Sequence, residues 1–375
     1  MNTVKIKSYA KINLTLEIKG IENGYHLLDS LVASIDLFDL VVLKKRKDKL
    51  SSITMRGMGS EGIPPEENIA LKTAELFSET FSTPGVDVTV YKNIPIGAGL
   101  GGSSADSAGV INGMAKLYGI TDEDALTALA EKTGSDTSYM RKGGFQRMQG
   151  RGEKLTPLSI QEKLYFLLLC PKTSVSSKAC FQTYDNLPRT LEYRGEPTRD
   201  LIEILQQNRI NEGGMYLMND LYVPATHLNK EVEIAKKEAE SFSPLGVTMT
   251  GSGSAVLAWF ESKELCEWAK SRYRGKCNAY VVVTVVPNDI SYHPLLRNIE
   301  LRNIYIVGAQ EVREELFRMI LIELSESYTS VKAIDRMNRE DRLEHGSIMP
   351  GQIAFQLLDR NKEVRRQQDR DRMRK

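Results

Sequence analysis

The sequence has 375 residues, of which 41% are hydrophobic and 26% charged, as in an ordinary globular protein. This composition excludes collagen-like, mucin-like and wholly disordered chains, and the length predicts two or three domains. Because 50 Lys and Arg residues balance 49 Asp and Glu residues, the net charge of +1 gives no electrostatic case for binding nucleic acid.

The distribution of apolar residues, cysteines and histidines predicts a cytoplasmic protein. No run approaches 18 consecutive apolar residues, so we expect no membrane span. The N-terminus alternates apolar with polar residues, unlike the continuous apolar stretch of a signal peptide. The four cysteines form no CxxC pair and are expected to be reduced thiols. The four histidines are scattered, so we expect no dedicated transition-metal site: His26, His227, His293 and His345.

The first 150 residues are expected to consist mainly of strands, followed by helices. Period-2 alternation with β-branched residues predicts strands, and apolar residues at helical spacing predict helices. We expect a strand pair over 3–20, a turn at Asn23-Gly24, a strand over 30–48, a helix over 66–81 and a strand over 86–96. A glycine-rich loop and a helix ending at Gly119 follow. The next helix is expected over 121–134, with Thr121 as its N-cap and Gly134 as its stop.

The pattern changes near residue 151. We expect a strand over 163–172, helices around 198–208 and 229–241, strands over 246–251 and 255–260, a helix over 262–273 and a strand over 278–286. This βαβ-like close suggests an α+β second domain. After Pro287, the segment 310–328 has the pattern of an amphipathic helix. The predicted organisation is therefore a domain over 1–150, a domain over 151–288 and a mainly helical extension over 289–375 of unknown role.

The segment Pro95–Ala108, PIGAGLGGSSADSA, carries the clearest chemical signal. Its glycines allow the backbone to turn and to bring N–H groups close to an anion. The following helix begins with unpaired N–H groups and the positive end of its dipole. Ser103 and Ser104 add hydroxyl groups for a phosphate oxygen or a metal-bound ligand. The alternative is a structural glycine-rich turn before a capped helix, but the strand-to-helix context favours phosphate binding.

Three well-known phosphate loops do not fit this segment. Residues 97–102 match GxGxxG, but Asp122 and Glu123 stand where a dinucleotide fold requires a strand that ends in an acidic residue. A Walker loop requires a lysine after its last glycine, and this chain has Ser103. A eukaryotic protein kinase requires HRD and DFG motifs, and neither follows.

The pattern P-x-x-x-G-L-G-x-S-S resembles the phosphate loop of the GHMP kinases. This resemblance implies an α+β, two-domain fold, with a ribosomal-S5-like N-terminal domain and a ferredoxin-like C-terminal domain. It also implies the cofactors ATP and Mg²⁺. The implied cofactor-binding residues comprise the loop and one asparagine before the helix IALKTAELF, which is alternatively only an N-cap: Pro95, Gly97, Gly99, Leu100, Gly101, Gly102, Ser103, Ser104 and Asn68.

Three further segments over roughly 1–288 are similar to one family of GHMP kinases, the 4-diphosphocytidyl-2-C-methyl-D-erythritol kinases. They are YAKINLTLEIKGIENGYHLLDSLVASIDLFD, EKTGSDTSYM and VTMTGSGSAVLAW. The chain departs from the family pattern at Asn23, where Asp is usual, at 137–140, where an apolar run is usual, and at Ser254, where Pro is usual. One serine of the glycine loop is also displaced by one position.

The resemblance implies two catalytic residues, Lys11 and Asp136. Phosphoryl transfer to an alcohol requires a group that orients the hydroxyl and accepts its proton, and the family uses this aspartate. The lysine would stabilise charge that develops on the transferred group. From the residues alone, Lys11 would be taken as an exposed strand lysine, and Asp136 as a solvated loop acid or a cap of the next turn.

The implied substrate-binding residues fall into two groups. Tyr25 would stack on cytosine, His26 would form a hydrogen bond to it, and Phe181 would supply a second stacking face. The alternative for Tyr25 and His26 is that they only pack against the rest of the protein at the start of a strand. Asn13 is a polar contact, and the turn Gly251, Ser252 and Gly253, otherwise a simple hairpin, would close on the substrate diphosphate.

The resemblance therefore implies ATP-dependent phosphorylation of the 2-hydroxyl of cytidine diphosphate-linked methylerythritol in non-mevalonate isoprenoid synthesis. One alternative is another GHMP kinase, of the homoserine or mevalonate type. A second alternative is a non-catalytic regulatory protein on the same scaffold, which the extension 289–375 favours. That extension could also support a homodimer or bind a partner.

Overall fold

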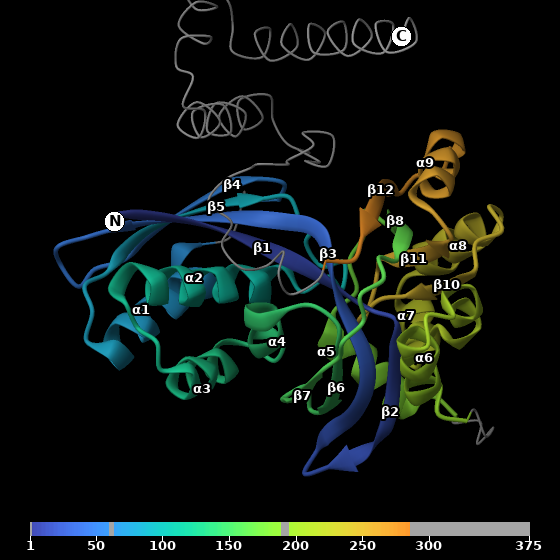
Figure 1. Ribbon diagram of the computed structural model, residues 1–375, viewed down its shortest axis with the longest axis horizontal. Coiled ribbons are helices and arrows are strands. Elements are labelled where there is room, and N and C mark those ends of the chain that lie inside the picture. Colours follow the sequence, from blue (N-terminus) through green and yellow to red (C-terminus); the bar gives the residue numbers. More distant parts are fainter. Residues whose placement is uncertain (1, 60–63, 189–194, 286–375) are drawn as a thin grey trace, which may run out of the picture. The chain divides into compact units, whose positions relative to one another are not determined.

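The computed structural model describes residues 2–59, 64–188 and 195–285, all of which belong to one compact unit (Figure 1). The helix expected over 310–328, the extension 289–375 and its possible partner contacts lie outside the described residues.

The larger sheet is built around one long strand. β3 (Tyr25–Lys45) pairs antiparallel with β1 (Thr3–Asn13), β2 (Thr15–Glu22), β5 (Val86–Lys92) and β6 (Gln146–Gly150). β4 (Ser52–Gly57) is parallel to β5, β7 (Lys154–Pro157) pairs with β6, and the two-residue β9 (Met218–Asn219) is parallel to β2. The expected turn between β2 and β3 is confirmed, because Asn23 and Gly24 both have positive φ, as a two-residue hairpin requires.

Four helices accompany this sheet: α1 (Ile69–Phe81), α2 (Gly102–Tyr118), α3 (Glu123–Thr133) and the short α4 (Thr137–Lys142). Apolar side chains of α1, α2 and α3 form one core cluster with β3 and β5. α2 ends at Gly119 and α3 ends at Gly134, as predicted. The N-cap prediction for α3 was wrong by one residue: the side chain of Asp122, not that of Thr121, accepts a hydrogen bond from the Ala125 N–H.

The smaller sheet has the order β10-β11-β8-β12 and is antiparallel throughout. Its strands are β8 (Tyr165–Cys170), β10 (Gly246–Met249), β11 (Val256–Phe260) and β12 (Asn278–Val283). Since β11 and β12 both run antiparallel to β8, the helix α9 (Lys263–Arg272) joins two parallel strands, which confirms the expected βαβ-like close. The remaining elements are α5 (Ser177–Asn186), α6 (Pro197–Gln206), α7 (Tyr222–Leu228), α8 (Lys230–Glu240) and the 3₁₀ turns Pro65–Glu67 and Ile210–Tyr216.

The middle of β3 joins the two sheets. The Val283 N–H donates to the Asp36 carboxylate at 2.9 Å, and the Val285 N–H donates to the Ser34 carbonyl at 2.9 Å. β3 therefore positions elements of both sheets. The boundary predicted at residue 150 falls at the turn between β6 and β7 and remains a prediction.

We predict that Asp36→Asn will make the protein more stable at pH 7 than the parent chain, with little difference at pH 4. Burial raises the pKa of Asp36 to about 6, although the Val283 N–H and two lysines oppose the shift. The folded state then holds the proton more tightly than the unfolded state. The stability contributed by this group is present at low pH and lost as pH rises from about 4 to about 6, by about 2 to 3 kcal/mol.

Urea unfolding at several pH values measures this difference. The substitution removes only the ionisable group, because the asparagine side chain can still accept the hydrogen bond from the Val283 N–H. Asp124→Asn, at an exposed aspartate in the first turn of α3, is the control. Parallel stability–pH curves for Asp36→Asn and the parent chain would contradict the prediction.

Candidate active site

Lys11 and Asp136 meet at the end of β1. The pairing of β1 with β3 is irregular between Tyr9 and Lys11, and such irregularities redirect side chains. The Lys11 side chain is directed inward, and the residue is only 5% exposed. Its Nζ lies 3.5 Å from Asp136 Oδ2 and donates to Asn13 Oδ1 at 2.6 Å. The structure therefore brings together three predicted site residues, and Lys11 is not the exposed strand lysine of the alternative interpretation.

Asp136 occupies the N-cap position of α4, but its side chain makes no capping hydrogen bond. By contrast, the Asp122 side chain does cap α3. The Asp136 side chain is 27% exposed, so a substrate hydroxyl can reach the carboxylate while the lysine stays buried beside it. This arrangement suits a group that receives a proton from a bound alcohol.

Asn13 connects β1 to the predicted loop at 251–253. Its N–H donates to Thr250 Oγ1 at 2.8 Å, and its Oδ1 accepts from the Gly251 N–H at 3.1 Å. Its Nδ2 donates to Ser30 Oγ at 2.8 Å, so every polar group of the side chain is used. Asn13 therefore fixes the 251–253 loop beside Lys11.

The glycine-rich loop lies between β1 and the 250–255 turn. The Lys11 N–H donates to the Leu100 carbonyl, and the Ala255 N–H donates to the Ala98 carbonyl, both at 3.1 Å. Gly99 has a φ of +78°, and a Cβ there would overlap the Thr250 carbonyl oxygen. A Cβ on Gly251 would lie 2.8 Å from the Gly99 carbonyl oxygen. The two loops are therefore in backbone contact, which only glycine permits.

The glycine-rich loop ends at the start of α2. Gly101, with a φ of +72°, is its N-cap and contributes no side-chain cap, so the first amides of α2 have no partner within the helix. The Ser104 hydroxyl lies 3.3 Å from the position of a Cβ on Gly134, two residues before Asp136. The first turn of α2 thus lies beside the loop that carries Asp136, with the Ser104 hydroxyl at this contact. Among the other loop residues, Pro95 and Leu100 are buried and Gly102 is half-buried. Gly97 and Ser103 are exposed.

The predicted base-binding residues are only partly brought together. His26 stacks on Phe181, with ring centroids 4.7 Å apart, and its Nε2 lies 2.8 Å from Asp185 Oδ1. Tyr25 is 55% exposed. In the part of the chain that the structure describes, its ring contacts Arg151 and does not stack on Phe181. Asp185 of α5 and Arg151 of the turn after β6 were not predicted as site residues.

Two other predicted residues have clear local roles. Asn68 is the N-cap of α1, and its Oδ1 accepts from the Ala70 N–H at 2.9 Å, which confirms the capping interpretation. Ser252 Oγ lies 2.7 Å from Ser177 Oγ, so the 251–253 loop also contacts the start of α5. Asn219, which the sequence analysis did not select, donates from Nδ2 to the Met249 and Gly251 carbonyls at 2.7 and 2.8 Å.

A buried ionic cluster beneath the loop was not predicted. Lys92 pairs with Asp39 and, at 2.7 Å, with Asp106 of α2. Burial opposes the charge of Lys92, but Asp106 and Asp39 outweigh it, so the pKa of Lys92 is raised. Burial also raises the pKa of Asp106 well above its usual range. The cluster ties β3, β5 and α2 together at the end of the glycine-rich loop, where a Cβ on Gly102 would lie 3.4 Å from Lys92 Nζ.

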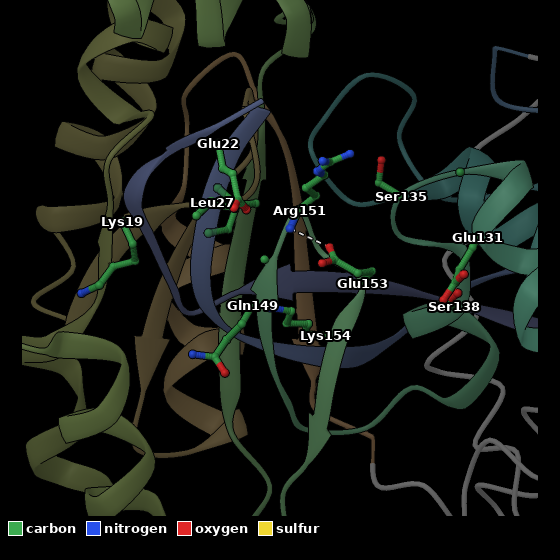
Figure 2. Close-up of a pocket in the computed structure, with 13 residues that line it drawn as sticks. Lys19, Glu22, Leu27, Glu131, Ser135, Ser138, Gln149, Arg151, Glu153 and Lys154 are labelled. Atoms are coloured by element: carbon green, nitrogen blue, oxygen red, sulfur yellow. Dashed lines mark hydrogen bonds between the residues drawn. The ribbon is translucent and has the colours of Figure 1, made fainter. Parts of the chain in front are cut away.

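A cavity of about 650 Å³ adjoins the Asp136 loop (Figure 2). It is lined by β2, β3, the β6–β7 turn and the residues before α4, including Leu28, Arg151, Glu153 and Ser135. Lysine, arginine and glutamate side chains mix around it, so the cavity presents no large region of one charge sign. It offers space for a sizeable polar substrate beside the predicted base.

The chain matches two protein families over its described part. Residues 68–146 match the GHMP kinases N terminal domain, and residues 196–276 match the GHMP kinases C terminal family. A homoserine kinase from Cytophaga hutchinsonii has a similar structure, with a TM-score of 0.59 at 19% identity over 76% of this chain and 95% of its own. Fold and glycine loop together define an ATP-dependent small-molecule kinase of the GHMP class.

The 4-diphosphocytidyl-2-C-methyl-D-erythritol kinase of Clostridium tetani is 33% identical over 288 residues, which cover 75% of this chain and all of the relative. A solved 4-(cytidine 5'-diphospho)-2C-methyl-D-erythritol kinase has a TM-score of 0.61 at 28% identity, over 75% of this chain and 99% of its own. The chain belongs to the 4-diphosphocytidyl-2-C-methyl-D-erythritol kinase family, as its motifs predicted. The two-domain α+β GHMP fold is likewise confirmed.

Among the helices of residues 2–59, 64–188 and 195–285, none has the length and apolar character to cross a membrane. Over the same ranges, no three His, Cys, Asp or Glu side chains gather in a way that could hold a metal ion.

We predict that Gly99→Ala will destabilise the protein and weaken ATP binding, because the new methyl group would overlap the Thr250 carbonyl. Gly119→Ala is the matched control, since Gly119 has a similar φ of +72° but has open space around its Cβ position. The control should lose about 1 to 2 kcal/mol from backbone strain alone. Gly99→Ala should lose a further 1 to 3 kcal/mol from overpacking. Urea unfolding and the KM for ATP measure both effects, and equal losses would refute the steric argument.

Proposed function

We propose that the chain transfers the γ-phosphoryl group of ATP to the 2-hydroxyl of 4-diphosphocytidyl-2-C-methyl-D-erythritol. The observation that carries this proposal is the constellation of Lys11, Asn13 and Asp136 at the meeting point of the two glycine loops. The names of the relatives support this choice of substrate. Retention of both charged groups favours the enzyme over a non-catalytic regulatory protein.

In the proposed reaction, Asp136 orients the alcohol and accepts its proton as the oxygen attacks phosphorus. Lys11 lies close enough to Asp136 to stabilise charge on the phosphoryl group in transit. The glycine loop and the first amides of α2 hold the phosphates of ATP. Mg²⁺ usually keeps several waters and is bound by substrate phosphates with one or two protein oxygens. The hydroxyls of Ser103 and Ser104, in the first turn of α2, would be the protein oxygens of such a site, where the ion would neutralise phosphate charge.

Selection of a cytidine-linked alcohol is assigned to Tyr25, His26 and Phe181. Stacking of a base on an aromatic ring contributes about 1 to 3 kcal/mol. The exposed ring of Tyr25 is available for such stacking. His26 is held by Phe181 and Asp185, so its ring orientation is set before the substrate binds. Homoserine and mevalonate carry no base, so this group of residues distinguishes the proposed substrate from those of other GHMP kinases.

The proposed function is tested by coupled measurement of ADP release from the purified full chain and ATP. The acceptors are the cytidylylated methylerythritol, homoserine and mevalonate, and the phosphorylated position is read by ³¹P and ¹³C NMR. We expect turnover with the cytidylylated alcohol and a product phosphorylated at its 2-hydroxyl. Turnover of homoserine or mevalonate alone would refute the proposal.

We predict that Asp136→Asn will lower kcat by about 10²- to 10⁴-fold, the usual effect of losing a positioned base. Since Asp136 makes no capping hydrogen bond, folding and ATP binding should be retained. Asp122→Asn is the matched control, because asparagine caps a helix as well as aspartate does and α3 lies outside the proposed chemistry. Near-normal turnover by Asp136→Asn would make this residue a structural acid.

The proposal includes a cytoplasmic location and a role for the C-terminal extension outside catalysis. Cys170, Cys180, Cys266 and Cys277 are free thiols, which supports a reducing compartment. The 288-residue match to the Clostridium tetani enzyme, which covers that relative completely, supports assigning catalysis to residues before the extension. We also propose that the extension, residues 289–375, forms a homodimer contact or binds a partner.

We predict that a chain ending at residue 288 will keep its KM values for both substrates, even if it melts at a lower temperature. Lys11, Asp136 and both glycine loops precede that residue. Circular dichroism establishes that the shortened chain is folded, and steady-state kinetics give the constants. A folded shortened chain without phosphoryl transfer would place part of the extension in the active site.

A further inference from the structure

Arg151 lies over the ring of Tyr25, with its guanidinium carbon 4.0 Å from the ring centroid. Tyr25 is the first residue of β3, and Arg151 lies in the turn between β6 and β7. Gly150, at the end of β6, pairs with Leu28 of β3, so the turn after β6 lies beside the first residues of β3. At this distance the guanidinium covers one face of the ring and is within range of a cation–π interaction.

The turn that carries Arg151 is fixed on both sides. The Arg151 N–H donates to Glu153 Oε2 at 2.6 Å, and the flanking Gly150 and Gly152 have φ values of +69° and +111°. A Cβ on Gly152 would lie 3.8 Å from the Ser135 carbonyl oxygen, so the turn contacts the residue that precedes Asp136. Figure 2 shows the Arg151 side chain extending toward Ser135 at the edge of the cavity. Arg151 therefore stands between the predicted base platform and the loop of the predicted proton acceptor.

Other arginines near the site are paired with carboxylates. Arg147 pairs with Asp29 at 2.6 Å, and Arg141 contacts Glu123 at 3.2 Å. By contrast, in the part of the chain that the structure describes, the Arg151 guanidinium contacts the face of the Tyr25 ring.

We propose that Arg151 is a positioning residue for nucleotide specificity: it stacks on one face of Tyr25 and holds the ring so that the other face receives the substrate base. This inference rests on the proposed function. An exposed tyrosine ring loses rotamer freedom when a ligand stacks on it, and ordering the ring in advance removes that cost from binding. Because Arg151 acts through Tyr25, its contribution should appear in binding of the cytidine-linked substrate and not in the chemical step.

The experiment is a double-mutant cycle on the full chain, with the variants Arg151→Ala, Tyr25→Ala and their combination. Arg151→Ala should raise KM for the cytidine-linked alcohol about two- to fivefold, the range of a cation–π contact at an exposed site, with kcat and KM for ATP unchanged. Arg151→Lys, which keeps a cation, should recover part of the loss. In the Tyr25→Ala background, removing Arg151 should have no further effect.

Arg272→Ala is the matched control, because Arg272 lies 4.9 Å over the Trp268 ring in α9, away from the proposed site. Its KM values should equal those of the parent chain. Binding of cytidine monophosphate is measured by calorimetry on the same variants, with the ATP site filled by a non-hydrolysable ATP analogue. This second measurement tests base binding independently of turnover.

The outcomes separate the two proposals. An unchanged KM for Arg151→Ala, or an effect that persists in the Tyr25→Ala background, overturns the positioning role; the latter shows that the guanidinium contacts the substrate directly. A parent chain that binds cytidine monophosphate without phosphorylating the cytidylylated alcohol overturns the proposed function alone. A parent chain that binds no cytidine nucleotide overturns both.

Discussion

The candidate site depends on a contact between two backbones. Gly99 of the glycine-rich loop and residues 250–253 approach so closely that a single methyl group on Gly99 or Gly251 would overlap a carbonyl oxygen. Close packing of this kind is intolerant of added volume. The contact therefore sets the separation between the loop assigned to ATP and the loop assigned to the second substrate. In the proposed reaction, that separation would determine how the phosphoryl donor and the acceptor hydroxyl are aligned.

β1 and β3 provide the frame that holds this contact in place. Lys11 and Asn13, two residues apart on β1, have side chains on the same face of the strand, as strand geometry requires. Lys11 donates its backbone N–H to one loop, and Asn13 binds the other loop through both backbone and side chain. The same short segment thus positions both loops and carries the predicted catalytic cation. An error in the register between β1 and β3 would displace all three together.

The regular elements were largely predictable because their signals are local. Alternation in β1 and the turn at Asn23-Gly24 depend on neighbouring residues, and so does the stop of α2 at Gly119. The N-cap of α3 was misplaced because Thr121 and Asp122 are adjacent cap formers and the sequence does not show which one satisfies the amide. Short elements such as α4 contain too few residues for a period to be visible.

The site itself was only partly predictable from the residues, for a different reason. The glycine loop shows its chemistry through its own composition, whereas Lys11 and Asp136 were assigned by resemblance because 125 positions separate them in the sequence. The contact of Arg151 with Tyr25 and the pairing of His26 with Asp185 depend on how distant strands and helices pack. The Asp39–Lys92–Asp106 cluster is also non-local, and no pattern within β5 indicates that Lys92 is buried.

Two buried lysines flank the glycine loop, and their surroundings separate their roles. Lys92 lies between the carboxylates of Asp39 and Asp106, so its charge is already neutralised by groups that hold the fold together. Lys11 has an uncharged amide at 2.6 Å and a carboxylate only at 3.5 Å, and that carboxylate is accessible from outside. A buried cation without full compensation is costly unless a further anion approaches it. The phosphoryl group transferred in the proposed reaction is such an anion. The incomplete compensation of the charge on Lys11 therefore favours it over Lys92 as the proposed catalytic lysine.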